Sequence, residues 1–273
     1  MKQIYGILGH PVEHSLSPAM HNAAFKAEGI DAEYRRFDLD PEAPEMLANF
    51  CYETDVNHIA GFSVTMPYKE QIMHFLDNIE VLAKEVSSVN TVKNENSNLN
   101  GYNTDATGAI KALQEKTEVK GKKALVLGAG GAARAIIYAL REFGAEVYIF
   151  NRTAQKAEAL AEKFDVETIG FRDIKDAGFD IIVNCTPIGM SPLIEQSLLT
   201  ADQIRKEAVV MDIITHPLET QLLREANKAG AETVSGERML LHQAAGQFEI
   251  WFNRSAPFEV MEKALYEALK KRS

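Results

Sequence analysis

A glycine-rich stretch in the middle of the chain has the residue types that bind the phosphates of a nucleotide. An apolar run, Ala124–Leu127, leads into Gly128–Ala133, and a helical pattern follows. The first glycine suits a tight turn, the second lets backbone approach a pyrophosphate, and Ala133 is small enough for a helix to pack on a strand. A dinucleotide pyrophosphate would lie on the N–H groups of a helix that begins near Gly131. The alternative is a turn that serves only packing. The residues predicted to contact the phosphates are Gly128, Ala129, Gly130, Gly131 and Ala132.

The end of the next apolar run, Glu146–Phe150, indicates which dinucleotide is bound. Proteins that select NAD usually place an acidic residue there to bind the ribose 2′-hydroxyl. Here Asn151, Arg152 and Thr153 follow the run, and Lys156 comes one helical turn later. Arg152 can bind a 2′-phosphate through two hydrogen bonds, whereas an acid would repel it. We therefore predict NADP(H) as the cofactor. In the other interpretation, Thr153 caps the following helix and Arg152 is a solvated charge, and both interpretations can hold together.

The composition excludes several classes of protein. The 273 residues are 46% hydrophobic and carry a net charge of −10, and no basic stripe is present. Nucleic acid and anionic membranes are therefore not expected as partners. Cys51 and Cys185 are far apart, which fits a reducing compartment. The first residues lack the apolar segment of a signal peptide, and no apolar run is long enough to span a bilayer. We expect a cytoplasmic protein, either a monomer or a homodimer, that binds small molecules.

The pattern of apolar runs predicts an α/β protein with two domains. Strand-like and helical segments alternate before residue 107, and Gln71–Val86 is predicted to be a helix, either unbroken or broken near Asp77. From Lys123 on, strands and helices alternate cleanly, which is typical of a doubly wound, Rossmann-type parallel sheet. The segment from Arg238 on is predicted to be helical with a break at Ser255–Pro257. We predict a substrate domain, residues 1–106 completed by 238–273, an NADP-binding domain, 107–237, and an active site in the cleft between them.

Eight short motifs together resemble the shikimate dehydrogenase (shikimate/quinate dehydrogenase) family. The resemblance spans nearly the whole chain, and the motifs occur in the family's order. They are the segments 14–18 (HSLSP), 63–69 (SVTMPYK), 89–91 (VNT), 103–105 (NTD), the glycine loop, 151–153 (NRT), 184–190 (NCTPIGM) and 236–243 (GERMLLHQ).

The resemblance implies the chemistry of a ketone reductase in the shikimate pathway of aromatic amino acid biosynthesis. Lys69 and Asp105 match the catalytic pair. A lysine can stabilise the alkoxide that forms when hydride reaches a ring ketone, and it can deliver the proton. A nearby carboxylate would hold the lysine and bind a substrate hydroxyl. By residue type alone, Lys69 could instead be a solvated charge and Asp105 a helix cap.

The resemblance also implies binding residues. Ser15 and Ser17 match the serines that bind the substrate carboxylate, although Ser17 could instead cap a helix with Pro18 in its first turn. Other matches are to residues that contact the substrate, its ring hydroxyls or the nicotinamide. The implied substrate residues are Ser15, Ser17, Thr65, Asn90, Thr215 and Gln243, and the implied nicotinamide residues are Ile213 and Gly236.

Three positions depart from the family pattern. Thr215 replaces a tyrosine that normally contacts substrate, Ala106 replaces a glycine, and Ser63 stands where asparagine is common. These departures leave quinate or an amino analogue of shikimate open as substrates. A different two-domain NADP-linked reductase, such as a methylene-tetrahydrofolate dehydrogenase or a glutamyl-tRNA reductase, and a non-enzymatic NADP sensor are further alternatives. The clustered histidines His10 and His14, with His21, have no metal-ligand spacing, so no metal is expected.

Overall fold

The chain folds into two compact units in the computed structural model, which describes residues 2–43 and 45–271. Unit 1 comprises the residues up to Thr104 and those from Gln243 on, and unit 2 comprises Asp105–His242. The chain passes from unit 1 to unit 2 after Thr104, two residues before the boundary predicted from the sequence. It returns to unit 1 at Gln243, five residues after the predicted boundary. The second crossing falls inside one continuous helix, α9 (Gly236–Phe252), so no turn residue marks it in the sequence.

Unit 1 is built on a mixed sheet of six strands in the order β2-β1-β3-β5-β6-β4. The strands β1, β2 and β3 are parallel, whereas β5 pairs antiparallel with both β3 and β6. The strands are β1 (Gln3–Gly9), β2 (Ala32–Asp38), β3 (Ile59–Val64), β4 (Asn78–Ile79), β5 (Thr91–Glu95) and β6 (Asn98–Tyr102). The helices of this unit, besides the end of α9, are α1 (Ser17–Ala27), α2 (Glu45–Tyr52), the 3-10 helix η1 (Gln71–Phe75), α3 (Val81–Glu85) and α10 (Phe258–Lys270).

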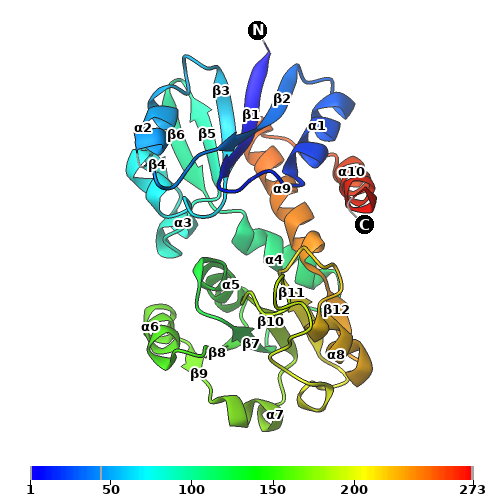
Figure 1. Ribbon diagram of the computed structural model, residues 1–273. Helices are drawn as coiled ribbons and strands as arrows, with labels where there is room; N and C mark the ends of the chain where they lie inside the picture. The colour runs from blue at the N-terminus through cyan, green and yellow to red at the C-terminus, as the bar shows by residue number, and fades with distance from the viewer. Residues whose placement is uncertain (1, 44, 272–273) are drawn as a thin grey trace. The chain divides into compact units, whose positions relative to one another are not determined.

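Helices cover both faces of this sheet (Figure 1). The helices α2, η1 and α3 pack on one face around buried Phe62 and Ile72. On the other face, Trp251 of α9 donates a hydrogen bond to the Val92 carbonyl at 2.9 Å and lies against Gly61, where a Cβ would come within 2.6 Å of the indole nitrogen. Phe248 and Trp251, which lie on α9 at core spacing, are both buried.

The segment Gln71–Val86 is predicted from its sequence to be a helix, either unbroken or broken near Asp77. The structure has the break, at Asp77. Asp77 accepts the Leu99 N–H with its carboxylate at 2.8 Å and donates its own N–H to the Leu99 carbonyl. The residues that follow form β4, which pairs with β6. The apolar spacing favours a helix here, but pairing with a distant strand determines the local structure. The sequence over 41–52 also predicts a helix, and the structure has α2 from Glu45 to Tyr52 there; Pro44 lies outside the described residues.

Unit 2 is a parallel sheet of six strands in the order β12-β11-β10-β7-β8-β9. When β7 is counted as the first strand, this is the strand order of a Rossmann sheet. The strand order reverses between β7 and β10, which is the switch point where such sheets bind ligands. The predicted doubly wound fold is confirmed. The strands are β7 (Lys123–Leu127), β8 (Glu146–Phe150), β9 (Glu167–Thr168), β10 (Ile181–Asn184), β11 (Val209–Asp212) and β12 (Glu232–Val234). The helices are α4 (Asp105–Gln114), α5 (Gly131–Glu142), α6 (Ala154–Phe164), η2 (Phe171–Asp173), α7 (Ile174–Ala177), η3 (Ala201–Gln203), α8 (Gln221–Ala229) and the start of α9.

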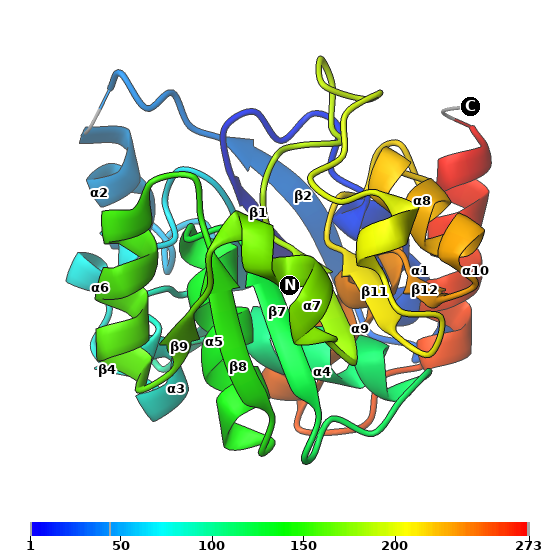
Figure 2. The ribbon, with the colours of Figure 1, turned by 90° about the horizontal axis from the view of Figure 1, so that it is seen from below.

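The central strands of unit 2 are apolar on both sides because helices lie on both faces (Figure 2). Leu125 and Leu127 of β7 face a cluster with α7 and α8, while Ala124 and Val126 alternate with them and are also fully buried. Such unbroken apolar runs are typical of parallel sheets.

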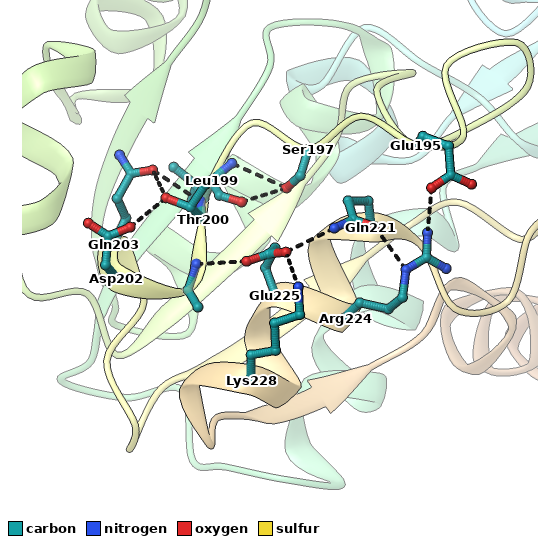
Figure 3. A network of polar contacts seen from close by, with 11 residues as sticks. Glu195, Ser197, Leu199, Thr200, Asp202, Gln203, Gln221, Arg224, Glu225 and Lys228 are labelled. Atoms are coloured by element: carbon teal, nitrogen blue, oxygen red, sulfur yellow. Dashed lines mark hydrogen bonds and ion pairs between the residues drawn. The ribbon is translucent and has the colours of Figure 1, made fainter.

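Side chains of α8 form a polar network that holds the start of η3 in place (Figure 3). Glu225 accepts the Ala201 N–H at 3.1 Å and pairs with Lys228 at 2.7 Å, and the Thr200 and Gln203 side chains cap η3. Arg224 extends the network toward Glu195, whose side chain is 80% exposed. This network is structural and partly exposed.

Candidate active site

The carboxyl ends of the parallel strands in unit 2 gather the predicted cofactor residues at one edge. The strands β7, β8 and β10 end in register, with Leu127 opposite both Phe150 and Asn184. Gly128 therefore follows β7 directly beside Asn151 after β8. In open parallel sheets, ligands bind at this edge, next to the switch point.

The glycine turn has the open backbone that a pyrophosphate needs. Gly128 has φ +113°, and a Cβ there would lie 3.1 Å from the Cys185 carbonyl oxygen, so both its conformation and its packing favour glycine. At Gly130, the N-cap of α5, a Cβ would meet nothing within 4 Å. The predicted helix start at Gly131 and the buried position of Ala133 are confirmed. The free first-turn N–H groups of α5 fit a bound phosphate.

The residues predicted to select NADP lie exposed at the end of β8. Arg152, Thr153 and Lys156 are exposed, and the Asn151 side chain donates to the Thr153 carbonyl at 2.9 Å. Thr153 occupies the N-cap position of α6, but its side chain makes no capping hydrogen bond. Two cationic side chains at this exposed edge can approach an anionic group at a smaller desolvation cost than buried charges would have.

A buried carboxylate, Asp212, organises the loops that follow β10 and β11. Its oxygens accept hydrogen bonds from the Asn184 side chain at 3.1 Å, the Thr220 hydroxyl at 2.7 Å and the Ile214 N–H at 3.1 Å. Burial raises the pKa of Asp212, against the lowering effect of these donors. Sequence reasoning did not select Asp212, because an acidic residue at the end of an apolar run carries no local sign of its partners.

The predicted nicotinamide residues lie beside this carboxylate. Ile213 is half-buried directly after β11, and its N–H donates to the Asn184 carbonyl at 3.3 Å. A Cβ on Gly236 would lie 2.4 Å from the Ile214 carbonyl oxygen, so only glycine fits at the start of α9. Thr215 is half-buried in the same segment.

Asp105 begins α4 and is 7% exposed. The other end of this helix is tied to α9, since Glu115 accepts hydrogen bonds from Arg238 at 2.9 Å and from His242 at 2.7 Å. Burial raises the pKa of Glu115, but these two partners lower it below its usual value overall. The ion pair fixes α4 against the start of α9 within unit 2.

Unit 1 gathers its predicted site residues at one edge of its sheet. Thr65 follows β3, and the Val64 N–H donates to the Asn90 carbonyl at 2.8 Å. The Lys69 carbonyl accepts the Val89 N–H at 2.9 Å, which fixes the backbone of the lysine beside Asn90. Lys69 and Thr65 are half-buried.

Asn90 is the centre of a buried amide network. Its side chain donates to Gln243 at 3.2 Å and accepts the Thr104 N–H at 2.8 Å and the Thr91 hydroxyl at 2.8 Å. Gln247, one turn after Gln243 on α9, donates to the Gln243 side-chain oxygen at 3.2 Å. The Gln243 side-chain oxygen thus accepts from two amides.

His21 of α1 lies next to this network and is fully buried. Its ring stacks on the Tyr34 ring, with 4.5 Å between the ring centroids. Its Nε2 lies 3.2 Å from the Gln247 side-chain oxygen, and its Nδ1 has no hydrogen-bond partner. Because Gln247 uses its amide nitrogen elsewhere, His21 donates from Nε2. Burial lowers the pKa of His21 to about 3, so the ring is neutral.

The two predicted carboxylate-binding serines lie at the start of α1. The Ser15 hydroxyl accepts the Ser17 N–H at 3.3 Å. The alternative in which Ser17 caps the helix is wrong: Leu16 holds the N-cap position, no side chain caps the helix, and Ser17 is its first residue. Burial raises the pKa of the nearby Tyr34 phenol, against the lowering effect of the Ser63 and Ser17 hydroxyls.

Three models of protein families match most of the chain. The model described as the shikimate dehydrogenase substrate binding domain matches residues 7–92, shikimate / quinate 5-dehydrogenase matches 111–226, and the shikimate 5′-dehydrogenase C-terminal domain matches 236–266. A protein from Methanopyrus kandleri named shikimate dehydrogenase (NADP(+)) is 42% identical over 98% of this chain and 96% of its own length.

The chain belongs to the shikimate dehydrogenase family. A crystal structure of a shikimate dehydrogenase in complex with NADP⁺ superposes with a TM-score of 0.91 at 43% identity, covering 97% of this chain and 95% of the other. A shikimate dehydrogenase from Thermus thermophilus in complex with NADP(H) and shikimate gives 0.89 at 37% identity, covering 97% and 99%. The family resemblance predicted from the eight motifs is confirmed.

Other features bear on the competing classes. Burial raises the pKa of Cys51 to about 12 and also raises that of Cys185, which disfavours the thiolate that a cysteine nucleophile requires. Among residues 2–43 and 45–271, no three histidine, cysteine or acidic residues are grouped to hold a metal ion. No helix in the described part of the chain is long and apolar enough to cross a membrane.

Proposed function

We propose that this protein catalyses the reversible, NADP(H)-dependent reduction of 3-dehydroshikimate to shikimate. The observation that carries this proposal is the similarity over 98% of the chain to proteins named for this activity, which accounts for both units. Unit 1, residues 1–106 completed by 238–273 in the sequence-based division, is proposed to bind substrate, and unit 2 to bind the dinucleotide. A cytoplasmic location and a monomeric or homodimeric state belong to the same proposal.

The residues of unit 2 fit NADP(H). The glycine turn supplies backbone N–H groups for the pyrophosphate, and Arg152 and Lys156 supply positive charge for the 2′-phosphate. Ile213 is proposed to shield the nicotinamide from water, with Gly236 allowing close approach of backbone. When bound, NADPH supplies the hydride that reduces the ring ketone.

Lys69 and Asp105 are proposed as the catalytic pair. The Lys69 ammonium stabilises the negative charge that develops on the ketone oxygen and then gives that oxygen a proton. Asp105 accepts a hydrogen bond from a substrate hydroxyl and so orients the ring. Ser15 and Ser17 donate hydrogen bonds to the substrate carboxylate, while Thr65, Asn90 and Gln243 are proposed to bind the ring hydroxyls.

Thr215 is proposed as a determinant of substrate choice. The family usually has a tyrosine here, and threonine is too short to reach the same point from the same backbone position. The carboxylate then depends more heavily on the two serines, and the space can admit a bulkier ring substituent. Quinate is therefore the second candidate substrate.

An absorbance assay at the reduced-nicotinamide band tests the proposal with shikimate and quinate, each with NADP⁺ and NAD⁺. We expect the highest kcat/KM for shikimate with NADP⁺. A higher kcat/KM for quinate would replace the proposed substrate, and equal use of both cofactors would contradict the role of Arg152. No turnover of either substrate would contradict the proposed activity.

A further inference from the structure

Two neighbouring strands of unit 2 are joined by buried polar side chains at the point where they end. Asn184 is the last residue of β10 and Asp212 the last residue of β11, and they are partners in the parallel register. The Asn184 side-chain amide donates to the Asp212 carboxylate at 3.1 Å, and both residues are 2% exposed or less. This pair lies at the start of both loops that follow the strands.

Asn184 shapes the loop after β10 with the rest of its side chain. Its amide also donates to the Ile188 carbonyl at 3.1 Å, and its oxygen accepts the N–H and the hydroxyl of Thr186 at 3.0 and 2.7 Å. The Thr186 hydroxyl in turn accepts the Ile188 N–H at 3.2 Å. The Thr186 methyl carbon lies 3.1 Å from the place of a Cβ on Gly128, so this loop packs against the glycine turn.

Asp212 holds the loop after β11 in a similar way. Besides the Asn184 amide, its oxygens accept the Ile214 N–H at 3.1 Å and the Thr220 hydroxyl at 2.7 Å. All three partners are donors, so the arrangement fits the ionised carboxylate, which accepts only. Thr220 is also the N-cap of α8. One carboxylate therefore fixes both ends of the segment between β11 and α8.

Ile214 is the residue of this segment that its surroundings constrain most. Gly189 has φ +105°, and a Cβ there would lie 3.4 Å from the Ile214 side chain. On the other side, the Ile214 carbonyl oxygen lies 2.4 Å from the place of a Cβ on Gly236. The neighbours of Ile214 in the chain are Ile213 and Thr215, the residues proposed to contact nicotinamide and substrate.

We propose that Asp212 is a positioning residue for the nicotinamide end of NADP(H). The inference rests on the nicotinamide role proposed above for Ile213 and Gly236. Asp212 acts through the backbone of Ile214 and so sets where Ile213 meets the ring. The adenosine end is proposed to lie at Arg152, which follows β8, three strands along the sheet from β11, or about 14 Å at the usual strand spacing. Asp212 should therefore affect one end of the dinucleotide and not the other.

The test uses two probes in titration calorimetry and needs no substrate. The probes are NADP⁺ and adenosine 2′,5′-bisphosphate, which keeps the adenosine end and lacks the nicotinamide. In Asp212→Ala we expect Kd for NADP⁺ to rise about tenfold, the size of one strong hydrogen bond, with Kd for the bisphosphate unchanged. An equal rise for both probes, or no rise for NADP⁺, would overturn the proposal.

Steady-state kinetics give a second readout. A displacement of the reacting atoms by about 1 Å can lower a rate about 100-fold, so kcat for shikimate should fall by about that factor in Asp212→Ala. A normal kcat would count against the inference. A wild type that binds NADP⁺ but turns over neither shikimate nor quinate would refute the proposed activity, and the two binding constants would still decide the role of Asp212.

Asp180→Ala is the matched control. Asp180 directly precedes β10, at the opposite end of that strand from Asn184. Its carboxylate accepts the Lys123 N–H at 3.0 Å and pairs with Arg205 at 3.3 Å, so its loss also removes hydrogen bonds from the sheet. We expect both binding constants and kcat to stay unchanged. A rise in Kd for NADP⁺ equal to that of Asp212→Ala would show a general effect of loosening the sheet and would overturn the proposal.

Asp212→Asn keeps an acceptor and removes the charge. Its oxygen can accept the Ile214 N–H, and the Thr220 hydroxyl can rotate to accept from the new amide. We expect Kd for NADP⁺ within about twofold of wild type, and a loss as large as that of Asp212→Ala would contradict positioning through Ile214. Should Asp212→Ala not fold, Thr220→Val is expected to raise Kd for NADP⁺ about threefold, and no rise would count against the proposal.

Discussion

The candidate site residues of unit 1 and those of unit 2 lie on sheet edges that are built in opposite ways. In unit 1, Asn90, Gln243 and Gln247 are buried and hydrogen-bonded to one another. In unit 2, Arg152, Thr153 and Lys156 are exposed at the end of β8, and the glycine turn presents backbone. The difference teaches that the substrate edge is part of the core, whereas the cofactor edge is a surface. Substitutions in the buried amide network of unit 1 should thus affect folding and function together, and those at Arg152 should affect function alone.

The largest expected effect is on the rate. Lys69→Ala should lower kcat about 100- to 10,000-fold, because a positioned proton donor is lost, with a much smaller change in KM. Steady-state kinetics with shikimate and NADP⁺ measure it. Lys93→Ala, a half-buried lysine of β5 paired with Glu95 at the surface, is the control and should keep its kcat. A near-normal kcat in Lys69→Ala would refute the catalytic assignment.

The second prediction tests the claim that the substrate edge is part of the core. Asn90→Ala removes the centre of the amide network and leaves the Thr104 N–H and the Thr91 hydroxyl without their acceptor. Buried unsatisfied groups cost about 1–3 kcal/mol each, so the free energy of unfolding should fall by about 3 kcal/mol. Urea unfolding measures this loss. Asn98→Ala, at the exposed first residue of β6, is the control and should lose far less.

Arg152→Asp tests the opposite claim for unit 2. Losing a charged bidentate contact and adding a repulsive carboxylate should weaken NADP⁺ binding by about 1.5–3 kcal/mol, with a relative gain for NAD⁺. The free energy of unfolding without cofactor should stay unchanged, because the side chain is exposed. Titration calorimetry and urea unfolding measure the two quantities. An unchanged preference would show that Arg152 does not contact the 2′-phosphate.

His21 makes the stability of unit 1 dependent on pH. Its pKa is about 3 in the folded state and near 6.5 when unfolded, so the unfolded state binds a proton first as the pH falls. Stability is therefore lost as the pH falls below 6.5, by about 2 kcal/mol from this residue at pH 5. Urea unfolding at pH 7.5 and pH 5 should show this slope in wild type and a smaller one in His21→Gln. The exposed His74→Gln should keep the wild-type slope. Equal slopes in all three proteins would disprove the assignment to His21.

The smallest effect is expected in the network on α8 (Figure 3). Glu225→Gln keeps an oxygen for the Ala201 N–H and removes the charge that pairs with Lys228. Ion pairs at a surface contribute little, so the loss should be about 0.5 kcal/mol or less and should vanish in high salt. If Glu225→Gln lowered the free energy of unfolding as much as Asn90→Ala, burial would not explain why one network stabilises the protein more than the other.

The features that could be predicted from the sequence are those that nearby residues determine. The glycine turn, the start of α5 and the alternation of strands and helices in unit 2 are determined by nearby residues, and each was predicted. The two-residue strand β4 was not, because it exists only through pairing with β6, about 20 residues later in the chain. Likewise Ser17 has the residue type of a helix cap, but α1 begins at Ser17 itself, with Leu16 at the N-cap position. Asp212 was not predicted as a site residue because folding brings its partners to it.

The helix α9 crosses from unit 2 into unit 1, and this has a consequence for synthesis on the ribosome. The sheet of unit 1 is translated first, but Trp251, which covers Gly61 and stacks near Tyr5, and α10, which packs on α1, are translated after all of unit 2. Until the last part of the chain emerges, the apolar face of the sheet on which Trp251 packs is therefore covered in part, by α1, whose His21 and Phe25 pack on Tyr34 and Tyr5. Unit 2 is contiguous in sequence and has all of its residues available earlier. The unit whose synthesis begins first is the one that is completed last.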